Sequence, residues 1–200
     1  MPAPSFSWPA PTTTAAVVIA GCIWGLFNAA IGMIFGFGTT MLVEQGWSLA
    51  AAGSATSLVL WLIAVSVPAG GVIADKTGRP MSVMLAGFVV TAIALFFAAQ
   101  TQHVLLLFTV LGLAGGVSAG PIMSLPARIL APPERAVGMG LYFTLFYVMC
   151  VVAPIIAGQL SAWNGSAHVA FSFGAVMLLL CVPAYWLFEA VASRAGKGGA

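Results

Sequence analysis

The most distinctive polar segment of this chain places one acid and two bases between spaced glycines. It reads Gly71-Val-Ile-Ala-Asp75-Lys76-Thr-Gly78-Arg79-Pro80. An acidic side chain near the carboxyl end of a helix opposes the helix dipole, so Asp75 should have a compensating partner. The candidate partners are Arg79, Arg128 and the helix start at Pro132-Pro133-Glu134-Arg135. A loop that is merely basic would explain Lys76 and Arg79 but not the position of Asp75. We therefore expect Asp75 to pair with a positive charge.

A second segment, Gly116-Val-Ser118-Ala-Gly120, formally matches the Gly-x-Ser-x-Gly motif of serine hydrolases. That motif needs a turn from a strand into a helix, whereas this segment lies inside a glycine-rich apolar stretch. The histidines that could serve as bases, His103 and His168, belong to distant connections. The cysteines lack the spacing of metal ligands and are expected to be small core residues: Cys22, Cys150 and Cys181. We therefore expect no enzyme, no metal site and no cofactor.

These residues must be positioned by helices in a membrane, because the chain is 62% hydrophobic and 5% charged. Such a composition cannot cover a water-facing surface. Splitting the sequence at its polar clusters leaves apolar stretches at 15–43, 49–73, 81–100, 104–126, 135–160 and 167–191. Each is long enough to cross a hydrocarbon core, and none alternates as barrel strands do. The predicted fold class is all-α, a polytopic membrane protein with six transmembrane helices.

The distribution of basic residues predicts the orientation of these helices. The connections around Glu44, His103 and His168 contain no Lys or Arg, and all six basic residues fall on the other side: Lys76, Arg79, Arg128, Arg135, Arg194 and Lys197. Because Lys and Arg are enriched in cytoplasmic loops, both termini should be cytoplasmic, with a bacterial inner membrane the expected location. Residues 1–14 read as a proline-rich lead-in, 15–192 as the membrane domain and 193–200 as a disordered tail.

Glycines at helical spacing mark the first and fourth stretches. Each set shares one face of its helix: Gly21, Gly25, Gly32 and Gly36 in the first, and Gly112, Gly116 and Gly120 in the fourth. Such faces usually pack against other helices, with ligand contact as the alternative. Pro121 interrupts the fourth stretch much as Gly36-Phe37-Gly38 loosens the first. This correspondence is the pattern expected of a three-plus-three inverted repeat.

Three side chains offer polar or amphipathic handles within apolar helices. We predict that Asn28, Trp61 and Tyr142 contact a solute, because binding sites of this kind use a few well-placed polar groups. The alternatives are lipid or core contact for Trp61 and a bond between helices for Tyr142. No charged residue lies near the middle of any span, which favours a neutral or weakly polar solute.

The segment 71–80 closely resembles a motif of the major facilitator superfamily, Gly-x-x-x-Asp-Arg/Lys-x-Gly-Arg/Lys-Arg/Lys. The residues that match are Gly71, Asp75, Lys76, Gly78 and Arg79, while Pro80 departs from the last basic position. Residues 125–138, which include Arg128, Glu134 and Arg135, also look like that family's connection between its fourth and fifth helices. Residues 153–158 resemble an antiporter signature only in part, so antiport is not assigned.

The resemblance implies a secondary transporter that works by alternating access. Superfamily members have twelve helices in two halves, so this chain supplies one half, with the carboxyl-terminal half favoured. Its partners would be a small solute, the lipid bilayer and a second six-helix half, either a parallel copy or a separate amino-terminal half; no nucleic acid is expected. Asp75 and Arg79 would then close a cytoplasmic gate. The gate motif also includes these residues: Gly71, Lys76, Gly78, Arg128, Glu134 and Arg135. The alternative is a non-transporting membrane scaffold or assembly subunit.

Overall fold

The computed structural model describes residues 7–195, and this part of the chain is helical with no strand. Its long helices are α1 (Pro11–Glu44), α2 (Leu49–Thr77), α3 (Pro80–Ala98), α4 (Val104–Ser124), α5 (Arg135–Asn164) and α6 (His168–Ala195). Two 3-10 turns, η1 (Pro126–Arg128) and η2 (Pro132–Glu134), join α4 to α5. All 6 long helices in this region are apolar and long enough to cross a membrane, which confirms the predicted fold class.

The first and last helices extend beyond the predicted membrane domain. Helix α1 begins at Pro11, inside the expected lead-in, because proline is accepted in the first turn of a helix. Helix α6 continues to Ala195, so Ser193 to Ala195 are helical rather than part of a disordered tail. The rest of that predicted tail, including Lys197, and residues 1–6 lie outside the described residues.

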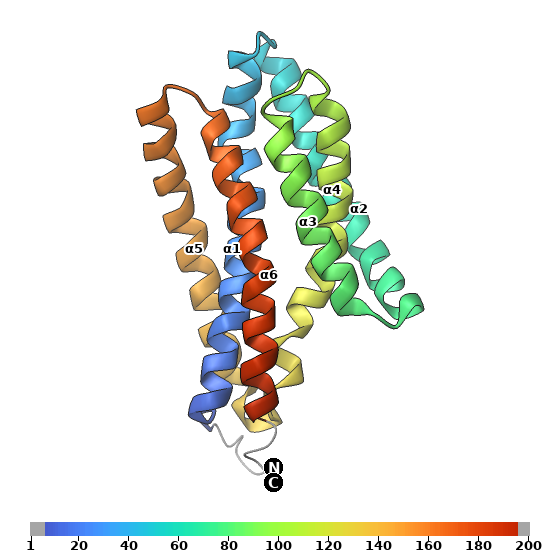
Figure 1. Cartoon of the computed structure of the whole chain (residues 1–200), viewed down its shortest axis with the longest axis vertical. Helices are drawn as coiled ribbons and strands as arrows, with labels where there is room; N and C mark the ends of the chain where they lie inside the picture. Colours follow the sequence, from blue (N-terminus) through green and yellow to red (C-terminus); the bar gives the residue numbers. More distant parts are fainter. Residues whose placement is uncertain (1–6, 196–200) are drawn as a thin grey trace.

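The packing of the helices repeats itself between the two halves of the chain. Helix α1 packs chiefly against α5 and α6, and α4 packs chiefly against α2 and α3 (Figure 1). Exchanging α1 with α4, α2 with α5 and α3 with α6 converts one set of partners into the other. The direct contact between α3 and α6 joins the two sets. This is the arrangement predicted for a three-plus-three inverted repeat.

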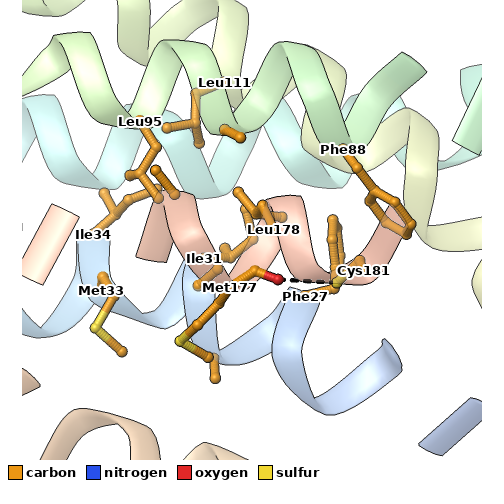
Figure 2. Close-up of a cluster of buried hydrophobic side chains, with 14 of the residues drawn as sticks. Phe27, Ile31, Met33, Ile34, Phe88, Leu95, Leu111, Met177, Leu178 and Cys181 are labelled. Carbon is orange, nitrogen blue, oxygen red and sulfur yellow. Dashed lines mark hydrogen bonds between the residues drawn. The ribbon is translucent and has the colours of Figure 1, made fainter. Parts of the chain in front are cut away.

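The buried core lies where α1, α3 and α6 meet. Figure 2 shows apolar side chains from these helices, such as Phe27, Phe88 and Leu178, packed together with Leu111 of α4. The rings of Phe27 and Phe88 lie 5.8 Å apart. Cys181 is fully buried among them and donates to the Met177 carbonyl at 3.3 Å. It is a small core residue, as its apolar surroundings predicted.

Both connections predicted to carry basic residues lie at one end of the bundle. The α2–α3 and α4–α5 connections are at the same end as the start of α1 and the finish of α6 (Figure 1). We call this the basic end, since it holds Lys76, Arg79, Arg128, Arg135 and Arg194. The α1–α2, α3–α4 and α5–α6 connections form the far end.

Candidate functional site

The motif segment closes α2 and opens α3 at the basic end. Gly78 has φ +61°, a left-handed conformation that suits glycine, and its N–H donates to the Asp75 carbonyl at 3.3 Å. The Arg79 N–H donates to the Thr77 hydroxyl at 3.4 Å. This tight turn leaves Asp75, Lys76 and Arg79 exposed. Their charges are therefore available to a partner outside this bundle.

The predicted pairing between Asp75 and Arg128 is not formed. Among the described residues, the ion pair of the structure joins Arg128 to Glu189 of α6, and Asp75 has no basic side chain within reach. Arg128 lies in η1, and its guanidinium is engaged by that carboxylate of α6. Of the candidate partners within the chain, Arg128 is thus excluded in this conformation.

Arg128 is instead the centre of a small polar cluster at the basic end. Its two terminal nitrogens contact the Glu189 oxygens at 2.6 and 3.2 Å. Its guanidinium lies 5.6 Å from the centre of the Phe188 ring and 3.7 Å from the Met81 sulfur. These contacts connect the α4–α5 connection to both α6 and α3. Sequence reasoning missed Glu189, although it is the acid within the last apolar stretch and lies at the level of the basic residues.

Glu134 and Arg135 serve to start α5. A Glu134 carboxylate oxygen accepts from the Ala131 N–H at 3.1 Å, which fixes the turn that precedes the helix. Pro133 in the same turn accepts from the Ser7 N–H at 3.2 Å, so the chain ahead of α1 lies against this connection. Arg135 is exposed at the first position of α5.

At the far end, Glu44 closes the bundle by capping α6. Its carboxylate accepts from the Ala167 N–H at 3.1 and 3.2 Å and from the Ser166 hydroxyl at 2.9 Å. A negative charge at the amino end of a helix is stabilised by the helix dipole. This contact ties the finish of α1 to the start of α6.

Some glycines on the glycine faces of α1 and α4 are covered by neighbouring helices, and others are not. A methyl group added at Gly25 would lie 2.8 Å from Met149 of α5, and one added at Gly112 would lie 2.6 Å from Leu62 of α2. Gly21 and Gly116 likewise meet α5 and α2. These four glycines therefore pack helices closely, and they do so in corresponding places in the two repeats.

Other glycines face open space, and they lie on four of the six long helices. Nothing lies within 4 Å of a methyl group added at these helical positions: Gly32 and Gly36 of α1, Gly53 and Gly71 of α2, Gly120 of α4 and Gly140 of α5. By contrast, Gly87 of α3 and Gly174 of α6 are both covered by neighbouring helices. We call the exposed sides of α1, α2, α4 and α5 that carry these glycines the open-glycine face.

The three predicted solute contacts lie in different surroundings. Asn28 is half-buried, and its amide donates to the Trp24 carbonyl at 2.9 Å. Trp61 is 72% exposed on α2. Tyr142 is completely buried, and its hydroxyl has no hydrogen-bond partner among the described residues. The structure does not bring these side chains together through hydrogen bonds or ring contacts.

Six apolar helices in two corresponding sets, with a charged turn at one end, define the described part of the chain as a polytopic membrane protein. The sequence model of the Major Facilitator Superfamily matches residues 13–200. The chain belongs to that superfamily, as its motif predicted.

Individual relatives agree with this assignment. An uncharacterized MFS-type transporter of Methanocaldococcus jannaschii is 30% identical over 114 residues, which cover 55% of this chain and 28% of the relative. An uncharacterized MFS-type transporter of Mycobacterium tuberculosis is 27% identical over 178 residues, or 82% of this chain and 39% of the relative, in both strains CDC 1551 and H37Rv. The chain thus spans well under half the length of these relatives.

Proposed function

We propose that this chain transports a small solute by alternating access, as one six-helix half of a twelve-helix unit. Membership of the superfamily and two relatives named as MFS-type transporters support transport across a membrane. The clustering of basic residues supports a cytoplasmic location for the basic end. The membrane we propose is a bacterial inner membrane.

The open-glycine face is the observation that supports association with a second six-helix half. A glycine that faces lipid adds no packing contact to its helix. A glycine that faces another helix allows the two backbones to approach closely. Such glycines occur on α1, α2, α4 and α5 and not on the described parts of α3 and α6. A partner half seated on this face would cover them. That partner is either a parallel copy of the chain or a separate amino-terminal half.

The exposed charges of the motif fit a gate at the cytoplasmic side of that interface. Asp75 and Arg79 would dock on a helix of the partner half and hold an outward-open state, then separate as the halves rock. An exposed pair of this kind contributes only about 0.2–1 kcal/mol. That amount is enough to shift two states of nearly equal free energy.

Asn28 is the best placed of the proposed solute contacts. It is half-buried, and the next turns of α1 carry the open Gly32 and Gly36. Trp61 would reach a solute only from the side of α2 that a partner covers, and Tyr142 only after α5 moves away from α1. A neutral or weakly polar solute suits a site built from these groups.

Native mass spectrometry of the chain in mild detergent, followed by uptake assays in liposomes, tests the proposal. A dimer that takes up solutes from a panel of neutral compounds would support a parallel half-size transporter. A monomer that becomes active only with a co-expressed amino-terminal half would support the other arrangement. An assembled unit with no uptake above empty liposomes would overturn transport and favour the scaffold alternative.

A further inference from the structure

A polar cavity of about 510 Å³ lies at the far end, away from the motif. It sits between the finish of α1 and the connection from α3 to α4, which are neighbours at the top of Figure 1. Its lining residues are Gln45, Trp47, Ala99, Gln100, Thr101 and Gln102. Three of the four glutamines of the chain thus line a single cavity.

Two helices end at this cavity. Helix α1 finishes at Glu44 and α3 at Ala98, and the Gln45 amide donates to the Ala99 carbonyl at 3.3 Å, which ties the two ends together. The carboxyl end of a helix carries a partial negative charge because its last carbonyls have no intrahelical donor. Two such ends side by side favour a bound positive charge.

The glutamine side chains supply hydrogen-bond acceptors at the cavity. Gln45 and Gln100 each commit an amide nitrogen to a backbone carbonyl, that of Ala99 and that of Phe96 at 3.1 Å. Their carboxamide oxygens therefore remain free to accept. Trp47 adds an indole ring, which attracts cations to its face. The lining is thus rich in acceptors and has an aromatic wall.

The charged groups around the cavity also favour a cation. None of the three connections at the far end contains Lys or Arg. The nearest carboxylate, Glu44, is engaged at the start of α6, and His103 is the titratable neighbour on the α3–α4 connection. An anion would find no basic side chain here.

We propose that this cavity binds a primary ammonium group, such as that of ethanolamine. A primary ammonium has three N–H donors for the free carboxamide oxygens, whereas a quaternary ammonium has none. The cavity lies beyond the ends of two membrane helices, so it is level with lipid head groups. The ligand is either the head group of phosphatidylethanolamine or a free amine.

Lipid binding to the purified, delipidated chain tests this proposal by native mass spectrometry. Phosphatidylethanolamine should bind roughly tenfold more tightly than phosphatidylcholine or phosphatidylglycerol of the same acyl chains, as expected for charge-assisted hydrogen bonds. If free ethanolamine at millimolar concentration also raises the melting temperature, the amine alone suffices; if only the lipid binds, the head group is the ligand. Equal binding of the three lipids with no effect of ethanolamine would overturn the proposal.

Matched glutamine variants assign the binding to this cavity. The Gln102 side chain makes no hydrogen bond to the described residues. Gln102→Leu should therefore remove most of the preference for the primary ammonium without lowering the melting temperature. Gln45→Leu should also remove it, but with some loss of stability because it breaks the bond to Ala99. Gln159→Leu, at an exposed position of α5, is the control and should keep the preference. A preference that survives both Gln102→Leu and Gln45→Leu would also overturn the proposal.

Discussion

The guanidinium of Arg128 and the carboxylate of Glu189 meet at 2.6 Å, across 61 residues of sequence, and join the α4–α5 connection to α6. The pair lies at the basic end, with side-chain exposures of 40% and 31%. It can therefore be exchanged or reversed without leaving a charge buried in lipid.

Replacing Glu189 with glutamine should lower the free energy of unfolding by about 0.2–1 kcal/mol, the usual value of an exposed ion pair. Thermal unfolding in detergent measures the effect. The reversed pair, Arg128→Glu with Glu189→Arg, should recover most of the loss, and Arg194→Gln should have no effect. A reversed pair no more stable than its single variants would show that charge pairing is not the source.

Replacing Glu44 with glutamine should destabilise the far end, because it weakens the cap on α6. Loss of a cap costs about 0.5–2 kcal/mol in other helices, and the smaller Ser166→Ala change should cost less because the Ala167 N–H keeps its acceptor. Chemical denaturation in detergent compares the two. A Glu44→Gln variant as stable as the unchanged chain would contradict the capping role.

Adjacent glycines on α2 should respond in opposite ways to the same substitution. A methyl group at Gly70 would lie 2.5 Å from the backbone of Val117 on α4, whereas one at Gly71 would meet nothing within 4 Å. Gly70→Ala should therefore cost about 1–3 kcal/mol, the usual penalty of overpacking. Gly71→Ala should leave the melting temperature unchanged. Equal changes in stability for Gly70→Ala and Gly71→Ala would mean that the backbones of α2 and α4 are farther apart at Gly70 than the structure shows.

Gly36→Leu should weaken association with the partner half while leaving the single chain folded. The added side chain has open space in the isolated bundle but would block the close approach of another helix. Native mass spectrometry gives the fraction assembled, and Val90→Leu on the exposed side of α3 is the control. Assembly unaffected by Gly36→Leu would place the partner on another face.

Asp75→Asn should shift the assembled unit toward the inward-open state, because the gate loses one charge. Cysteines introduced at the far end should then react more slowly with an impermeant maleimide added from outside, and cysteines at the basic end should become more accessible. Arg194→Gln, which alters a charge at the same end, serves as the control. Unchanged labelling in Asp75→Asn would remove Asp75 from the gate.

The helices and their order could be predicted from the sequence, because continuous apolar stretches and the positions of Lys and Arg report directly on a bilayer. The turn at Gly78 could be predicted from the motif. The pairing of Arg128 with Glu189 could not, because it depends on how η1 lies against α6, and no local pattern encodes that approach. The same holds for Glu44 and the start of α6.

Burial within the membrane was the least predictable property. Side chains on all sides of each span are apolar, so their spacing does not separate the packed side from the side toward lipid or a partner. Tyr142 is therefore fully buried and Trp61 largely exposed, although their sequence settings are similar. The glycines of α1 share one face, yet Gly25 is covered and Gly32 open, because α5 contacts only part of that helix so closely.

The partners of α1 and α4 have a consequence for the order of assembly during synthesis. Helix α4 packs chiefly on α2 and α3, which precede it directly, so these three can come together soon after they enter the bilayer. Helix α1 packs chiefly on α5 and α6, which are made later than α2, α3 and α4. We expect α1 to remain longer without its main neighbours than α4 does, and this bundle to be most vulnerable to misassembly and proteolysis until α6 is inserted.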